Sequence, residues 1–445
     1  MPNVLILKPD EIDSAEKRSK LSISVVGCGR KGILYAYAFA KAGFKVSCVD
    51  PDANVIRKLA RGKTPFREQE IEGKLKSLIS AGQLSVTGEL KKTVSRSDVV
   101  IVAVPANVDE KKKIDYTEAT SILKQVGAAL HSGMLVIYGE VAGLGFMEGV
   151  AKEILEDTSG LKAGVDFGLA YVPIHNSQVK QLDDPAIYLE LKVAVFGKSG
   201  QDATLNLAKT VAKSVGQLSN MKTAEIATLF TATKQDISAA LGGELAIFCE
   251  DAGIDYFEVL KSLGFNDPSF WPAVDDQENR NEAYLLLEAA ENINAKLRLP
   301  ELARQVNEEM VKHAVNLTQD ALRSCDKTLR RARIAVLGRV SPNTNSAVYV
   351  KSLLLKGAKA SLYDPVSKSD ASDVGVAKTS LNETVEGADC LVVLTGEEQF
   401  KRLNLRKLKA LMKTPSVIVD LAGAFERSAV EAEGFIYRGL GRGTG

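Results

Sequence analysis

The sequence predicts an α/β fold in which two doubly wound parallel-sheet domains are joined by an all-helical middle domain. Three observations predict it: strand, glycine turn, helix and strand follow one another from Leu21; helical periodicity replaces strands over 222–330; and a second strand-turn-helix set starts at Arg333. Alternating strands and helices are typical of parallel sheets covered by helices. The predicted parts are an extension (1–20), a first sheet domain (21–218), a helical domain (219–330) and a second sheet domain (331–445).

The first sheet domain opens with the strand-like run 23–27, and a helical pattern follows at 33–43. Residues rich in Val and Ile, bounded by polar segments, indicate further strands. These runs are 45–50, 98–104, 134–138 and 193–196, with helical patterns such as 115–130 between them. The alternation predicts one doubly wound sheet that ends near Leu218.

The middle segment has long helical periodicity that Gly242 and Gly243 interrupt. Paired glycines lower helix propensity and mark the close approach of a second backbone or of a ligand, and packing is the favoured explanation. The basic stretch 327–333 lies at the next junction, where a solvated linker face is favoured over a binding patch. The runs of the second sheet are 333–338, 359–364, 389–395 and 416–421.

Composition excludes several classes of function. Apolar residues make up 45% and charged residues 25%, which is typical of soluble globular proteins. Lys and Arg number 57 against 56 Asp and Glu, so no general field attracts nucleic acid or a membrane. The five cysteines are scattered without metal-like spacing, and no signal peptide or membrane-length apolar run is present. We therefore expect a soluble cytoplasmic protein without a metal, nucleic-acid or membrane partner.

The strongest functional signal is a G-x-G-x-x-G motif that follows a predicted strand and opens a helix, and it consists of Gly27, Cys28, Gly29, Arg30, Lys31 and Gly32. In this context Gly27 permits a tight turn, Gly29 lets a pyrophosphate approach the backbone, and Gly32 lets the helix pack on the strand. The helix N-terminus supplies N–H donors for the anion. The alternative is a nucleotide-free turn with incidental glycines.

An acidic residue completes the motif, because Asp50 ends the next strand at the usual distance from the first glycine. Its carboxylate would accept hydrogen bonds from the adenosine ribose and repel a 2′-phosphate, so the predicted cofactor is NAD rather than NADP. Val104 and Pro105, where the run 98–104 ends, belong to the same predicted cofactor-binding set. Arg30 and Lys31 either strengthen pyrophosphate binding by charge or are solvated residues of the first helical turn.

Five segments resemble a known family, the nucleotide-sugar 6-dehydrogenases that include the UDP-glucose and UDP-N-acetylmannosamine dehydrogenases; these segments are 49–90, 95–119, 159–174, 243–260 and 434–443. The resemblance spans nearly the whole chain. It implies two Rossmann-like domains, the first for NAD and the second for a nucleotide diphosphate, around a helical middle that carries a dimer interface. A nucleotide-sugar-like ligand and a homodimer are therefore expected.

The resemblance also implies a chemistry for which this sequence lacks the residues. The family oxidises an alcohol twice with one NAD per step, and a cysteine thiolate holds the intermediate aldehyde. Matching on Pro272 places Phe270 at the cysteine position, and the glutamate, lysine and asparagine positions fall at Ile174, Ser238 and Gly243. The loop 340–348, matched to a uridine-diphosphate loop, has lost its lysine and arginine, and the turn 139–145 has also changed.

Three residues are weak catalytic candidates. Lys234 lies one helical turn before Ser238, His175 follows Ile174, and Ser269 precedes Phe270. Each has a plainer explanation, as a solvated lysine, a histidine without catalytic duty and a loop hydroxyl. Two hypotheses follow: an oxidoreductase that acts on an altered CH–OH substrate, and a non-catalytic NAD-binding scaffold or regulatory subunit.

Overall fold

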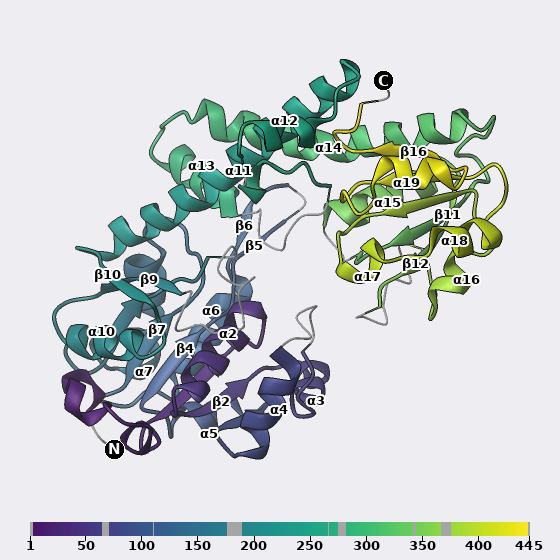
Figure 1. The fold of residues 1–445 in the computed structure, drawn as a ribbon. Coiled ribbons are helices and arrows are strands. Elements are labelled where there is room, and N and C mark those ends of the chain that lie inside the picture. The colour runs from purple at the N-terminus through teal and green to yellow at the C-terminus, as the bar shows by residue number, and fades with distance from the viewer. Residues whose placement is uncertain are drawn as a thin grey trace. The chain divides into compact units, whose positions relative to one another are not determined.

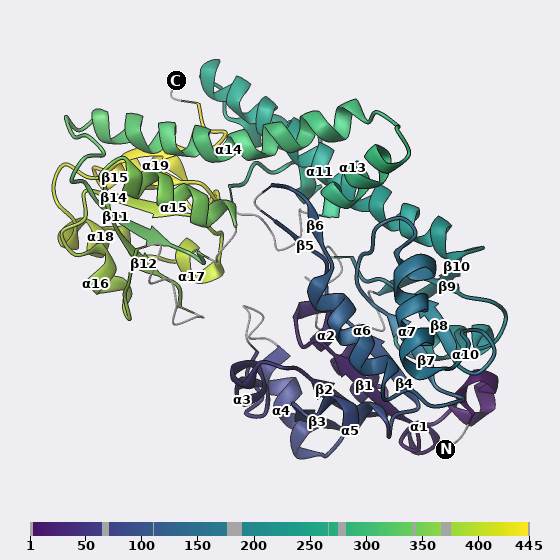
Figure 2. The same ribbon diagram turned by 180° about the vertical axis from the view of Figure 1, so that it is seen from behind.

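The computed structural model describes residues 3–64, 71–109, 111–175, 189–265, 267–274, 282–340, 344–365 and 375–443. The chain divides into two compact units, residues 1–232 with 281–296 and residues 233–280 with 297–445. Figures 1 and 2 show the ribbon from opposite sides. The predicted class is confirmed, because each unit holds a mainly parallel sheet with helices, and long helices lie between the two sheets in sequence.

The sheet of the first unit has the order β10-β9-β8-β7-β4-β1-β2-β3. Its strands are β1 (Ser22–Val26), β2 (Lys45–Val49), β3 (Leu84–Thr87), β4 (Val99–Val102), β7 (Leu135–Tyr138), β8 (Gly168–Tyr171), β9 (Glu190–Val195) and β10 (Ser214–Gln217). All neighbours are parallel except β8 and β9. On the central strand, Val25 lies opposite Cys48 of β2 and Ile101 of β4. A small antiparallel pair, β5 (Asn107–Val108) and β6 (Ile114–Asp115), lies outside this sheet.

Both faces of this sheet are buried. Along β4, Val99 and Ile101 belong to one apolar cluster, and Val100 and Val102 belong to the other. Helices cover both faces, as parallel sheets require, and each fully buried Val or Ile contributes about 1.5–3 kcal/mol. The helices are η1 (Val4–Ile6), η2 (Pro9–Glu11), α1 (Ala15–Arg18), α2 (Arg30–Lys41), α3 (Ala53–Leu59), α4 (Glu72–Ser80), α5 (Leu90–Val94), α6 (Thr117–Gly127), η4 (Phe146–Ala151), α7 (Lys152–Ser159), α10 (Gln201–Lys209) and α13 (Glu282–Asn292).

The second unit contains a six-stranded parallel sheet in the order β13-β12-β11-β14-β15-β16. Its strands are β11 (Arg333–Leu337), β12 (Lys359–Tyr363), β13 (Val376–Ala377), β14 (Cys390–Val393), β15 (Val417–Asp420) and β16 (Ile436–Gly439). The helices are α12 (Tyr256–Ser262), η5 (Pro268–Phe270), α14 (Arg298–Arg323), α15 (Asn345–Leu355), α16 (Leu381–Val385), α17 (Glu398–Lys401), α18 (Leu405–Leu411) and α19 (Arg427–Ala432). The 31-residue helix α11 (Met221–Asp251) begins in the first unit and ends in the second.

Close packing explains the paired glycines of α11. A Cβ atom added to Gly242 would lie 2.3 Å from the carbonyl oxygen of Phe270, and one on Gly243 would lie 2.9 Å from the sulfur of Met310. The prediction that another backbone approaches this pair is confirmed at Gly242.

Helix α13 belongs to the first unit, although helices of the second unit flank it in sequence. Lys113 Nζ lies 3.0 Å from a carboxylate oxygen of Glu291, and Lys112 lies over the ring of Tyr284. The predicted boundaries near 218 and 330 stay predictions.

Candidate dinucleotide site

The turn between β1 and α2 can be built only with glycine at two positions. Gly27 has a φ of +93°, and a Cβ atom there would lie 2.5 Å from the carbonyl oxygen of Ala103. A Cβ atom on Gly32 would lie 1.9 Å from the carbonyl oxygen of Gly27. Gly27 therefore makes the tight turn and Gly32 lets the helix pack against it, as the motif requires.

The middle glycine has a different environment. A Cβ atom on Gly29 would meet nothing within 4 Å, so open space lies beside this backbone. Gly29 is also the N-cap of α2, and no side chain of the described residues caps that helix. An uncapped helix N-terminus beside open space fits a pyrophosphate, because the first N–H groups and the helix dipole attract an anion.

Among the described residues, the first helix of the second sheet begins differently from α2. Its first helix, α15, is capped by the side chain of Thr344, which accepts a hydrogen bond from Ala347 N. Part of the loop predicted for a nucleotide diphosphate, 341–343, lies outside the described residues. Of the two turns, the one before α2 therefore has the geometry that fits a dinucleotide among the described residues.

Asp50 is fixed directly beside the glycine turn. One carboxylate oxygen accepts a hydrogen bond of 2.8 Å from Cys28 N, and the other accepts one of 2.9 Å from Asp52 N. Each oxygen keeps a further lone pair for a ribose hydroxyl. Cys28 contributes its backbone N–H to this arrangement. The pKa of its thiol is raised by a hydrogen bond with Cys48 and by burial.

Val104 lies against the same turn, and Pro105 follows it in the chain. A Cβ atom on Gly27 would come within 2.9 Å of the Val104 side chain, and Tyr138 donates a hydrogen bond of 2.9 Å to the Val104 carbonyl. The structure thus brings the glycine motif, Asp50 and Val104 together at the carboxyl ends of β1, β2 and β4, and the role of Pro105 stays a prediction. Open α/β sheets bind their ligands at this edge.

The interpretation of Lys31 as a solvated residue of the first helical turn is wrong, because its side chain is buried. Its side chain is 2% exposed, and Nζ lies 2.8 Å from Glu140 Oε2 and 3.1 Å from Glu282 Oε1. Burial opposes the charged amine, but the two carboxylates outweigh it and raise the pKa of Lys31. Burial also raises the pKa of Glu282, although Lys31 acts in the opposite direction. Arg30 is half-buried.

Sequence reasoning missed this charged cluster. Glu140 was noticed only as part of a changed turn, and Glu282 lies 251 residues from Lys31. The available signal was a lysine at the start of a helix whose next residues, 32–40, are mostly apolar, because a buried ammonium needs a carboxylate partner.

The three weak catalytic candidates lie in different units. His175 belongs to the first unit, where burial and the nearby charge of Lys31 lower its pKa to about 4. Lys234 and Ser269 belong to the second unit, and both act on Asp267: hydrogen bonds from Ser269 lower the pKa of Asp267, and the charge of Lys234 adds to the effect. Asp267 Oδ1 accepts a hydrogen bond of 2.9 Å from Ser269 N. The catalytic roles of these three candidates stay predictions.

The position matched to the cysteine nucleophile is part of a packed turn. The carbonyl oxygen of Phe270 accepts a hydrogen bond from Tyr256 and lies against Gly242. Ile174, at the position matched to a glutamate, is fully buried. Neither side chain can transfer a proton or act as a nucleophile.

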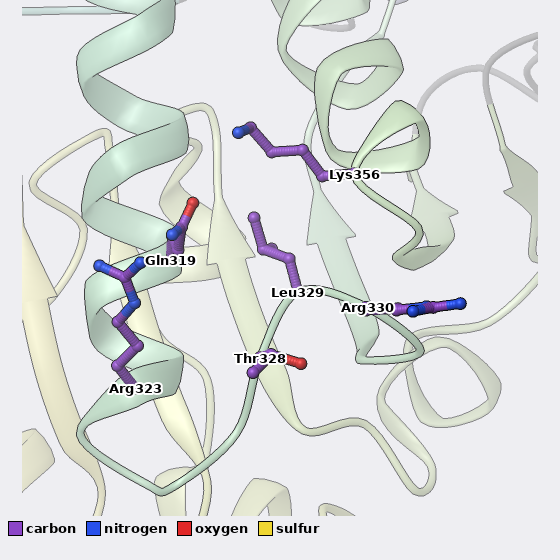
Figure 3. A pocket seen from close by; sticks show the side chains of 6 residues that line it. All are labelled: Gln319, Arg323, Thr328, Leu329, Arg330 and Lys356. Carbon is purple, nitrogen blue, oxygen red and sulfur yellow. The ribbon is translucent and has the colours of Figure 1, made fainter.

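A hollow in the second unit is lined by three cations, and Figure 3 shows Arg323 on α14, Lys356 at the end of α15 and Arg330 on the loop before β11. Gln319, Thr328 and Leu329 complete its lining. Cations at helix C-termini are favoured by the helix dipole, which explains Arg323 and Lys356 without a ligand. Lys327 of the basic stretch pairs with Asp389 at 3.0 Å.

The described part of the chain has neither a candidate metal site nor a candidate membrane-spanning helix. No group of three or more His, Cys, Asp or Glu residues there could hold a metal ion. None of the described helices is both long enough and apolar enough to pass through a membrane.

Comparisons with known proteins agree with this geometry. Residues 21–209 match the model of the UDP-glucose/GDP-mannose dehydrogenase family NAD binding domain, and residues 342–427 match the UDP binding domain of the same family. The chain is 28% identical over 444 residues to the UDP-N-acetyl-D-mannosamine dehydrogenase of Pyrococcus horikoshii, covering 95% of this chain and 100% of the relative. It is 24% identical over 448 residues to the UDP-glucose 6-dehydrogenase of Rhizobium meliloti, covering 95% and 100%.

A solved structure of UDP-D-ManNAc dehydrogenase from Pyrococcus horikoshii matches with a TM-score of 0.80 at 25% identity and covers 95% of this chain and 100% of that one. The predicted cofactor, NAD, is confirmed by the match to the NAD binding domain.

Proposed function

Because the chain belongs to the UDP-glucose/GDP-mannose dehydrogenase family, we propose that it binds NAD and a nucleotide-sugar-like ligand without completing the double oxidation of a UDP-sugar. The chain then transfers at most one hydride per ligand. A non-catalytic NAD-binding scaffold or regulatory subunit is the second candidate. A cytoplasmic location is part of the same proposal.

The observation that carries the proposal is the state of the cysteines. All five are buried: Cys28, Cys48, Cys249, Cys325 and Cys390. Burial raises the pKa of Cys249, Cys325 and Cys390. The pKa of Cys28 is raised by its hydrogen bond with Cys48 and by burial. Covalent trapping of an aldehyde needs an accessible thiolate. Five buried thiols do not supply one.

A single hydride transfer has fewer requirements. It needs bound NAD, a positioned alcohol and a group that accepts the hydroxyl proton. The open glycine turn provides for the cofactor, and Lys234, His175 and Ser269 are the proposed candidates for the remaining roles. His175, with a pKa of about 4, is neutral at pH 7 and is a weak base.

The scaffold has its own support at the positions matched to the catalytic glutamate, lysine and asparagine. Ile174 offers no titratable group, Ser238 offers a hydroxyl, and Gly243 packs against Met310. Losing general acid-base help alone typically costs about 100- to 10,000-fold in rate.

Self-association is proposed through α11, with a second copy of this chain as the occupant. Leu241, Leu245 and Phe248 follow helical spacing on one face and are 44%, 42% and 66% exposed. A dimer interface is also what the helical middle of the resembled family implies. Light scattering at micromolar concentration should give a dimer for the wild type and a monomer for Phe248→Glu, whereas Val165→Glu, at an exposed apolar residue of the first unit, should stay dimeric. A monomeric wild type would contradict the proposal.

The deciding experiment counts NADH. The pure chain is incubated with NAD and a panel of UDP-sugars, and absorbance gives the NADH formed per sugar consumed. One NADH identifies the single oxidation, and none, with NAD bound, identifies the scaffold. Two NADH per sugar at an ordinary turnover rate would refute the proposal. A Phe270→Cys, Ile174→Glu, Ser238→Lys variant that gains the double oxidation would support it, because the matched positions would then be the missing ones.

A further inference from the structure

The orientation of a bound dinucleotide follows from the sheet order. β2 and β3 lie on one side of β1, and β4 and β7 lie on the other. Asp50, which follows the end of β2, would hold the adenosine ribose, and the turn before α2 would hold the pyrophosphate. The nicotinamide half of a bound dinucleotide would therefore lie toward the carboxyl ends of β4 and β7.

The buried charged cluster lies on this nicotinamide side. Lys31 is in the first turn of α2, Glu140 is two residues beyond the end of β7, and Glu282 is the first residue of α13. Their side chains are 2%, 7% and 10% exposed. Two carboxylates thus share one ammonium, away from water.

Charges in such a place act strongly on a neighbouring ligand, because the local dielectric is lower than in water. His175, whose charge could offset a carboxylate, is neutral above its pKa of about 4. The oxidised nicotinamide ring carries a positive charge and the reduced ring is neutral. The two redox forms of the cofactor therefore differ in the one property to which carboxylates respond.

We propose that Glu140 and Glu282, held by Lys31, select the redox state of the cofactor, so that the chain binds NAD⁺ in preference to NADH. Selection of this kind is a difference between two binding free energies, and the carboxylates favour the cationic form. The inference rests on the NAD binding of the proposed function and deepens it. In either proposed role, a chain with this preference releases NADH readily and stays loaded with NAD⁺.

The test is calorimetric titration of the full chain with NAD⁺ and separately with NADH at pH 8. We expect the wild type to bind NAD⁺ at least about tenfold more tightly, which corresponds to about 1.4 kcal/mol. Glu140→Gln and Glu282→Gln each remove one negative charge and keep the shape, so each should lower the ratio of the two affinities at least about threefold. Lys31→Met should raise the ratio, because it removes the positive charge.

Glu16→Gln is the matched control, since Glu16 is an exposed residue of α1 that precedes β1 and should leave the ratio unchanged. Thermal melting identifies variants that fail to fold, and the two glutamate variants test the same point independently. Equal affinity of the wild type for both nucleotides would overturn the inference alone, as would a ratio unchanged in a folded glutamate variant. Failure to bind either nucleotide would refute the proposed function as well.

Discussion

Replacing Lys31 with Met should destabilise the folded chain far more than the same replacement of Lys92, a surface lysine whose ion pair has nearly the same length. Lys31 lies 2.8 Å from Glu140, and Lys92 lies 2.7 Å from Glu89. The first pair is buried, whereas the side chains of the second are 58% and 64% exposed. Distance is thus held nearly constant while burial changes.

The size of the effect follows from solvation. Removing one partner of a buried pair leaves an uncompensated charge and costs about 3–5 kcal/mol, whereas an exposed pair contributes about 0–1 kcal/mol. In Lys31→Met, Glu140 and Glu282 remain close without their cation, so protonation relieves the repulsion. Burial raises the pKa of Glu282, so the destabilisation is complete above this pKa and becomes smaller as the pH falls through it.

Urea unfolding at pH 8 and pH 5 measures this prediction. For Lys31→Met the free energy of unfolding should fall by about 3–5 kcal/mol at pH 8 and by less at pH 5, and Lys92→Met should change it by about 1 kcal/mol or less at both. Equal losses in the two variants, or a larger loss for Lys31→Met at pH 5, would refute the reasoning.

The remaining predictions concern glycines and a histidine. Gly29→Ala should leave the free energy of unfolding unchanged and weaken NAD binding at least about tenfold in calorimetry. Gly32→Ala should weaken NAD binding and also destabilise the fold by about 1–3 kcal/mol, because its Cβ atom would lie 1.9 Å from a carbonyl oxygen. Gly242→Ala should cost a similar amount in urea unfolding because a backbone oxygen would lie 2.3 Å away, whereas Gly73→Ala, which meets nothing within 4 Å, should not be destabilised. Burial lowers the pKa of His175 to about 4 from an ordinary value of about 6.5, so the unfolded chain binds the extra proton between these values. Stability should fall by about 1–2 kcal/mol between pH 7 and pH 5, and His175→Gln should remove that part of the fall; identical pH profiles would contradict this.

Local patterns were sufficient to predict the two sheets and the helices between them. The central strands β1, β4, β7, β11, β14 and β15 are apolar on both faces, so they appear as continuous apolar runs in the sequence. The edge strands β3 and β10, which are partly exposed, were not predicted, and neither was the buried interior strand β8. The antiparallel pairing of β8 with β9 depends on tertiary contacts that a local pattern does not contain.

The candidate site divides in the same way. The glycine motif and Asp50 are local signals, because a strand, a turn and the next strand fix their positions. The charged cluster joins Lys31 to Glu140 and Glu282, which are 109 and 251 residues away, and no periodicity links positions so distant. The plain explanation of Lys31 as a solvated residue was wrong because its carboxylate partners come from other elements.

The measurement that tests NAD binding most directly is calorimetric titration of the full chain with NAD and with NADP, for the wild type and for Asp50→Ala. We expect the wild type to bind one NAD per chain and to prefer NAD to NADP. Asp50→Ala should weaken NAD binding about tenfold or more, since charge-assisted hydrogen bonds contribute about 1.5–3 kcal/mol, and should narrow the preference because repulsion of the 2′-phosphate is lost. A wild type that gives no binding heat with NAD, or that binds NADP equally well, would contradict the assignment of this turn to NAD.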